Sequence, residues 1–114
     1  MCWKSIRLEL ARTFEFPVGS VSRAYLLRLP LDDKNGIDAS ELERHPQKAT
    51  VPRHWSSEAD ERGQVFRDGV DWVLHCNGQR RTLHFNSAAL HQGEQVNLTE
   101  ANGDILPFRV ASIR

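Results

Sequence analysis

The residues of this sequence best suited to chemistry lie near its centre, on two alternating runs at 70–76 and 79–85. A short run upstream adds two further basic residues. The candidate binding residues are His75, Arg80, Thr82, His84, Arg53 and His54. Guanidinium forks and imidazoles suit the recognition of phosphate or carboxylate groups. The alternative for the same residues is an ordinary solvated face of a sheet.

Asp71 and His84 come nearest to a catalytic pair, and Ser87 follows closely in the sequence. A carboxylate can orient an imidazole as a general base for a serine nucleophile. However, nothing in the spacing places Ser87 on that imidazole, and Asp–His pairs across strands also serve sheet stability. We predict no catalytic residue, and Asp71, His75 and His84 are the acid–base candidates if the chain is an enzyme.

A metal site needs three or four converging ligands, and the five histidines offer no such cluster by spacing. In the predicted hairpin, His75 and His84 lie about four residues apart along the ladder, which is roughly 13 Å. The sequence also lacks a phosphate loop, a dinucleotide-binding glycine motif, a paired-histidine metalloprotease motif and a calcium loop. We predict neither a metal nor a cofactor.

The charge of the chain is balanced, because 15 Lys and Arg face 15 Asp and Glu over 114 residues. A general nucleic-acid binder usually carries a clear basic excess, so single-stranded nucleic acid is an alternative partner and not the expected one. The acidic run at 58–61 is expected to be a solvated loop.

Several features bear on the compartment of the protein. No apolar run reaches the length of a membrane span, and charges at Lys4, Arg7 and Glu9 argue against a secretory signal. Cys2 and Cys76 match no zinc or redox spacing, and Cys76 is expected to be a buried free thiol. These features predict a cytoplasmic protein with no membrane attachment.

The central hairpin is predicted from an Asn-Gly pair at 77–78 between two alternating runs. A two-residue loop there sets Leu74 opposite Arg81 and Asp71 opposite His84. A second turn at 68–69 sets Val65 opposite Trp72. These pairings place the apolar side chains of all three segments on one face.

The last hairpin is predicted from matching apolar residues on its two strands. The pattern aligns Val96 with Val110 and Leu98 with Phe108. This alignment requires a loop with an odd number of residues, with Gly103 at positive φ in a bulged turn.

The first half of the chain predicts three strands and one helix. Alternation predicts strands at 5–16, 22–31 and 49–55, and prolines in the last two mark them as sheet edges. Asp38 followed by a carboxylate three residues later predicts a short helix at about 38–45, which Pro46 ends.

Together, seven or eight short strands and one helix predict a mainly β protein, a single domain over 1–114. Its form is either a small, partly open antiparallel barrel or a two-sheet sandwich. The expected interior consists of Trp55, Trp72, Leu74, Leu83, Phe85, Val96, Leu98, Phe108 and Val110.

The function expected from these features is that of a non-catalytic binding module. It would act through a sheet face or an exposed edge strand, on a protein partner or a second copy of itself. The alternatives are a small-ligand or regulatory binder and a small acid–base enzyme using a His/Asp pair.

Overall fold

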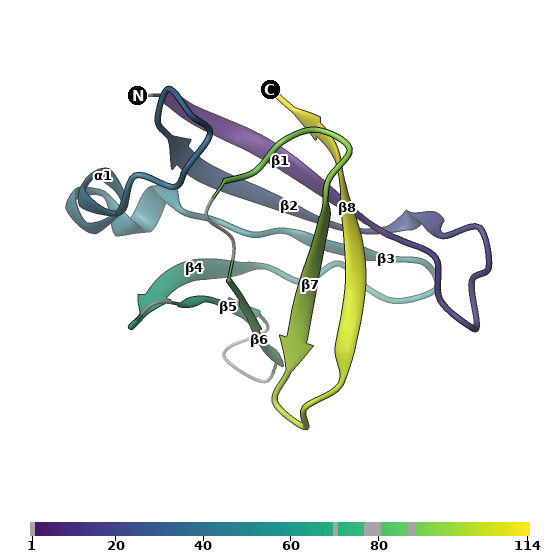
Figure 1. Cartoon of the computed structure of the whole chain (residues 1–114). Helices are drawn as coiled ribbons and strands as arrows, with labels where there is room; N and C mark the ends of the chain where they lie inside the picture. The colour runs from purple at the N-terminus through teal and green to yellow at the C-terminus, as the bar shows by residue number, and fades with distance from the viewer. Residues whose placement is uncertain (1, 70, 77–80, 87–88) are drawn as a thin grey trace.

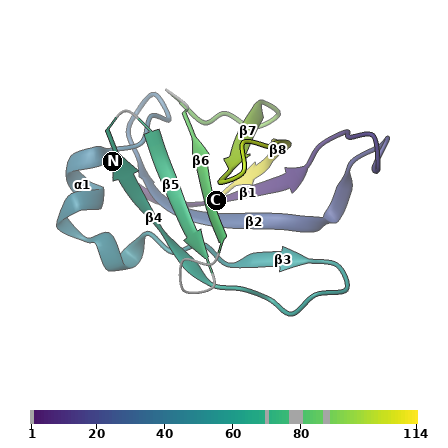
Figure 2. The ribbon, with the colours of Figure 1, turned by 90° about the horizontal axis from the view of Figure 1, so that it is seen from below.

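A computed structural model describes residues 2–69, 71–76, 81–86 and 89–114 (Figure 1). Within them, one antiparallel sheet curls into a nearly closed barrel, in the order β3-β2-β1-β8-β7-β6-β5-β4 (Figure 2). The strands are β1 (Cys2–Leu10), β2 (Ser20–Leu31), β3 (Arg53–Trp55), β4 (Gly63–Asp68), β5 (Asp71–Cys76), β6 (Arg81–Phe85), β7 (Gln95–Glu100) and β8 (Ile105–Ile113). The mainly β prediction is confirmed, with the barrel as the form adopted.

The two edge strands of this sheet approach each other and nearly close the barrel. Residues 49–53, which lead into β3, run antiparallel to residues 61–65, which lead into β4. The Val51 N–H donates to the Gly63 carbonyl at 2.9 Å, and Arg53 and Glu61 exchange two backbone hydrogen bonds of 2.8 and 3.0 Å. We call this junction the seam.

Alternation along the strands turns one set of side chains into the barrel, because successive residues of a strand point to opposite faces. The interior is apolar, and burial of these side chains favours the folded state. All but one of the predicted interior residues are buried: Trp72, Leu74, Leu83, Phe85, Val96, Leu98, Phe108 and Val110. Trp55 is partly buried and packs against this core.

The predicted helix is present as α1 (Ala39–Arg44). The Asp38 carboxylate accepts a hydrogen bond from the Glu41 N–H at 3.1 Å, which is the expected N-terminal cap. Pro46 ends α1 and begins a single 3-10 turn, η1 (Pro46–Lys48). No helix in the described ranges has the length and apolar character needed to cross a membrane.

The predicted register of the central hairpin is wrong by two residues. Leu74 lies opposite Leu83, and His84 lies opposite Val73 instead of Asp71. A shift of two keeps every side chain on its predicted face, because the side-chain period of a strand is two. The shifted register also pairs apolar with apolar side chains across the two strands. The free energy of this packing outweighs the preference of the Asn-Gly pair for a two-residue turn. The predicted Asn-Gly turn at 77–78 lies outside the described residues.

The neighbouring hairpins differ from the prediction in the same way. Val65 lies opposite Leu74 and not Trp72. Val96 lies opposite Phe108 and not Val110, so Leu98 meets Leu106. The odd loop is confirmed, since Glu100 and Asp104 are bridged by a 2.7 Å hydrogen bond around residues 101–103. Gly103 has the predicted positive φ, at 93°.

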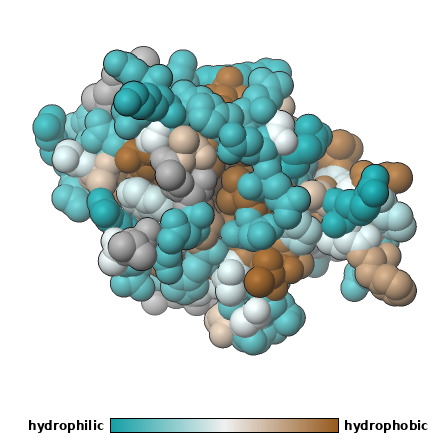
Figure 3. Space-filling model, in the orientation of Figure 1, coloured by the Kyte–Doolittle hydropathy of each residue, from teal (hydrophilic) through white to brown (hydrophobic). Residues whose placement is uncertain are grey.

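The first strand is shorter than predicted, because β1 ends at Leu10. Thr13 and Phe16 instead form a local turn, in which the Phe16 N–H donates to the Thr13 hydroxyl at 3.0 Å. Phe14, which shares the alternating position of Leu8 and Leu10 in the predicted strand 5–16, is fully exposed. Figure 3 shows brown, apolar atoms on the projecting part of the molecule that carries this connection.

The prediction that strand 22–31 is an edge is also wrong. β2 lies between β1 and β3, and the Leu26 and Arg28 N–H groups donate to the Pro52 and Thr50 carbonyls. Pro30 lies beyond the last of these bonds, and its carbonyl accepts from the Asp38 N–H. Its missing N–H therefore removes no hydrogen bond of the sheet.

Candidate functional site

The corrected register brings two of the candidate histidines together on the outside of the barrel. His75 lies opposite Thr82 on neighbouring strands, and His84 lies opposite Val73. The two histidines are therefore diagonal neighbours, at a typical spacing of roughly 7–8 Å between residue positions. The predicted separation of the two histidines by about four residues along the ladder is therefore wrong, because it was based on the displaced register.

These residues line a shallow cleft of about 220 Å³. We call it the imidazole cleft, and its walls are Phe66, Arg67, Asp68, Val73, His75, Thr82 and His84. The Phe66 and His75 rings lie 5.2 Å apart between centroids, and the buried His75 Nδ1 has no hydrogen-bond partner among the described residues. The cleft is smaller than the usual small-molecule site of about 300 Å³ or more.

The described residues around the imidazole cleft do not bring together the Asp–His pair that the sequence offered as a catalytic candidate. Asp71 pairs with Asp68 across the β4–β5 turn, so the predicted Asp71–His84 pair is absent. In the part of the chain that the structure describes, no three His, Cys, Asp or Glu side chains are arranged to hold a metal ion. Ser87 and Arg80 lie outside the described residues.

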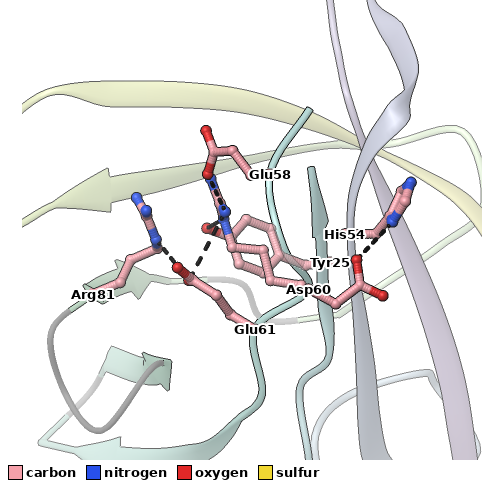
Figure 4. A network of polar contacts seen from close by, with 7 residues as sticks. Tyr25, His54, Glu58, Asp60, Glu61 and Arg81 are labelled. Atoms are coloured by element: carbon pink, nitrogen blue, oxygen red, sulfur yellow. Dashed lines mark hydrogen bonds and ion pairs between the residues drawn. The ribbon is translucent and has the colours of Figure 1, made fainter. Parts of the chain in front are cut away.

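Arg53 belongs to a different group of residues, at the seam, where it pairs with Glu61. Figure 4 labels its partners Tyr25, Glu58 and Glu61. Only 3% of its surface is exposed, and its guanidinium lies 4.3 Å from the centroid of the Trp55 ring. Its Nε donates to the Tyr25 hydroxyl at 3.3 Å, and its Nη1 donates to Glu58 Oε1 at 3.1 Å. Arg53 therefore points into the barrel and not onto the predicted binding face.

Glu61 is the carboxylate that joins this group across the seam. Its Oε1 accepts from Arg81 Nε at 3.0 Å and lies 3.8 Å from Arg53 Nη1. The Glu61 side chain is only 16% exposed, so the expectation of a solvated acidic loop is wrong at this position. The sequence signal for these ion pairs was the acidic run at 58–61 together with arginines elsewhere in the chain. The sequence could not show that Arg53 and Arg81 lie beside Glu61, because their proximity depends on closure of the barrel.

Burial keeps the two weak acids of this group protonated. Burial raises the pKa of the Tyr25 hydroxyl to about 12, although the Arg53 cation opposes the change. Burial raises the pKa of the Cys76 thiol to about 11, and the nearby Glu61 charge adds to the effect. Neither group is ionised near neutral pH, so the charges at the seam there are those of Arg53, Arg81, Glu58 and Glu61.

His54 takes part in a separate contact on the surface. Its Nδ1 lies 2.9 Å from the Asp60 carboxylate, and both side chains are more than half exposed (Figure 4). The contact does not involve the imidazole cleft. The six candidate residues are thus divided among the cleft, the seam and the surface, with Arg80 outside the described residues.

Among the described residues, the large apolar side chains with the greatest exposure lie elsewhere, on residues 11–21, which we call the apolar connection. Phe14, Val18 and Val21 are exposed over 101%, 94% and 70% of their reference areas. An open pocket of about 310 Å³ borders this connection and is lined by Leu10, Thr13, Phe14, Glu15, Phe16, Arg23, Trp55 and Leu106. A second open pocket, of about 270 Å³, is lined by Glu9, Leu10, Ala11, Arg12, Val18, Gly19, Ser20, Val21 and Arg109.

Local contacts hold the apolar connection in place against the barrel. The Thr13 N–H and the Gly19 N–H both donate to the Phe16 carbonyl at 2.9 Å. The Arg23 guanidinium lies 4.2 Å from the centroid of the Phe16 ring and 5.9 Å from that of Trp55. Alternation over the predicted strand 5–16 placed Phe14 on the same face as Leu8 and Leu10, so the sequence did not reveal this apolar exposure.

Comparison of the chain with protein-family models, with curated proteins and with solved structures found no match.

Proposed function

We propose that this protein is a non-catalytic binding module that docks a protein partner on the apolar connection. The observation that carries the proposal is the exposure of three large apolar side chains, Phe14, Val18 and Val21, on one short connection that borders two open pockets. Single exposed apolar residues are ordinary on a protein surface, but several on one short segment beside open pockets are typical of an interaction site.

The energetics of burial favour a protein partner. Covering a fully exposed Phe or Val side chain contributes about 1.5–3 kcal/mol, and exposed aromatic residues are frequent anchors of protein interfaces. Val18 and Val21 are aliphatic and offer no ring on which a base could stack. The neutral charge of the chain also disfavours nucleic acid as the partner.

Other routes to binding have less support. Recruitment of a partner strand needs a free sheet edge, but the seam and β2 use most of the backbone groups that the prediction assigned to edges. The imidazole cleft is a second candidate surface, and its half-exposed Phe66 makes it a suitable control. An acid–base enzyme lacks its predicted pair, since Val73 and not Asp71 faces His84.

Site-specific photo-crosslinking tests the proposal. Phe14 is replaced by the photoreactive residue benzoylphenylalanine, and a matched protein carries the same residue in place of Phe66. Both are irradiated in cells of the organism that makes the protein. We expect a discrete protein adduct from position 14 that a Val18→Ser change in the same chain abolishes.

The control position separates this proposal from the sheet-face alternative. Adducts from position 66 alone would move the site to the imidazole cleft. Equal adducts from both positions, or none from either, would contradict docking on the apolar connection.

A further inference from the structure

We infer that the partner presents an acidic segment with an apolar anchor residue, an inference that rests on the proposed function. The observation behind it is the charge around the apolar connection, in a chain whose formal net charge is zero. The charged residues that line the two pockets or bond to their walls are Arg7, Arg12, Arg23, Arg109, Glu9 and Glu15. Four guanidiniums thus face two carboxylates.

One of the two carboxylates is already shared. Glu9 Oε2 accepts from Arg7 Nε at 2.7 Å, and Glu9 Oε1 accepts from Arg109 Nη2 at 3.5 Å. Arg7 also donates from Nη2 to the Val21 carbonyl at 2.9 Å, which ties this pair to the apolar connection. A single negative charge between two positive charges leaves this wall of the 270 Å³ pocket positive.

The remaining two arginines have no carboxylate partner within the described ranges. Arg12 is exposed at the 270 Å³ pocket, and no hydrogen bond or ion pair joins it to the described part of the protein. Arg23 donates to the Ser20 hydroxyl at 3.2 Å and otherwise lies against the Phe16 and Trp55 rings. A carboxylate of a partner can accept charge-assisted hydrogen bonds from either guanidinium.

The apolar anchor is indicated by the walls of the 310 Å³ pocket. Leu10, Phe16, Trp55 and Leu106 provide apolar surface there, and Phe14 lies at the same pocket. Arg23 already stacks on one ring of this pocket, so an aromatic ring from the partner can meet a cation as well as apolar surface. The chemistry thus favours Phe, Trp or Leu with Asp or Glu close by in the partner sequence.

The same charges disfavour a second copy of this chain as the partner. In a symmetric dimer the same patch meets itself, which would place these arginines opposite one another. Like charges held together in an interface are repulsive. An acidic segment of another protein removes this repulsion and uses the unpaired guanidiniums.

Selection from a random 12-residue peptide library displayed on phage tests the inference, with the full chain as bait. We expect selected peptides to carry Phe, Trp or Leu within three positions of Asp or Glu. Binding of a synthetic selected peptide should weaken about fivefold in Arg12→Gln and again in Arg23→Gln, and it should weaken with added salt. Arg28→Gln is the control, since Arg28 is an exposed arginine on β2, away from both pockets.

The outcomes distinguish a failure of the inferred partner chemistry from a failure of the proposed function. Peptides that need Phe14 and Val18 but show no acidic residues and no dependence on Arg12 or Arg23 would overturn the inference and leave the proposed function standing. Peptides that bind a Phe14→Ser/Val18→Ser bait equally well, or a library that yields none, would contradict both. A random single-stranded oligonucleotide that displaces the peptide at low salt, or a concentration-dependent dimer that the peptide disrupts, would replace the acidic protein with another partner.

Discussion

Glu61 is the single residue on which the electrostatics of the seam depend most. It holds two guanidiniums, and the Arg53 side chain is only 4% exposed. Without Glu61, the buried Arg53 cation keeps only the half-exposed Glu58 as an ion-pair partner, and Arg81 loses its 3.0 Å ion pair. We expect Glu61→Ala to lower the free energy of unfolding by about 2–4 kcal/mol in urea denaturation.

Glu58 provides the matched control for this change. It contacts the same guanidinium at 3.1 Å, but half of its side chain is exposed. We expect Glu58→Ala to lower the free energy of unfolding by less than about 1 kcal/mol. Equal losses for the two variants would show that Glu61 has no special role at the seam.

The raised pKa of Cys76 makes stability depend on alkaline pH. An unfolded thiol loses its proton near its ordinary value of 9.0, whereas in the folded protein the pKa is about 11. The folded state therefore holds more protons between these values, so the free energy of unfolding falls as pH rises from about 9 to 11. Below pH 9 this contribution is constant.

Urea denaturation at a series of pH values measures the effect. Cys76→Ala should show a shallower decline above pH 9 than the unchanged chain, whatever its stability at neutral pH. Tyr25 adds a similar decline above its ordinary value of 10.0 in both proteins. Identical slopes for the two proteins would contradict burial as the cause.

At the scale of elements, Gly63 controls how closely β4 approaches β5. A Cβ atom at Gly63 would lie 1.8 Å from the His75 carbonyl oxygen, a distance that no packed structure tolerates. The Gly63 carbonyl also accepts the Val51 N–H at the seam. We expect Gly63→Ala to lower the free energy of unfolding by at least about 2 kcal/mol, because β4 must move.

Gly103 is the control for this prediction, because a Cβ atom there meets nothing within 4 Å. Its φ of 93° makes alanine unfavourable without any collision, at a cost of about 1 kcal/mol. Chemical denaturation of both variants compares the two effects. A larger loss for Gly103→Ala would contradict the close approach at Gly63.

The hairpins show how much of an element can be predicted. Which side of a strand faces the interior was correct for Leu74, Leu83 and Phe108, yet all three predicted hairpin registers were displaced by two residues. Alternation has a period of two and cannot distinguish registers that differ by two. Cross-strand packing makes that distinction, and it also brings His75 and His84 to diagonal positions.

For the whole molecule, the barrel and the apolar connection should be energetically separate. Phe14 and Val18 are almost fully exposed, so their replacement removes little packing. We expect Phe14→Ser/Val18→Ser to change the free energy of unfolding by no more than about 0.5 kcal/mol. Phe16 packs against the core, and Phe16→Ser should lower that free energy by about 2 kcal/mol.

Thermal and urea denaturation of these two variants test the separation. The result also validates the double variant as a bait in binding experiments, because lost binding would then not reflect lost folding. A large destabilisation by Phe14→Ser/Val18→Ser would mean that the apolar connection serves the barrel and not a partner.

By itself, the sequence determined the mainly β class, the α1 cap at Asp38, the odd loop at 101–103 and the inward face of most strands. These features depend on neighbouring residues, through side-chain alternation and local hydrogen bonds. Tertiary structure alone decided the seam, the place of Glu61 between two arginines and the exposure of Phe14. The seam and the place of Glu61 depend on where segments distant in the chain meet when the sheet curls, and local patterns carry no information about that closure. Phe14 is exposed because β1 ends at Leu10, although the alternation of its sequence continues to Phe16.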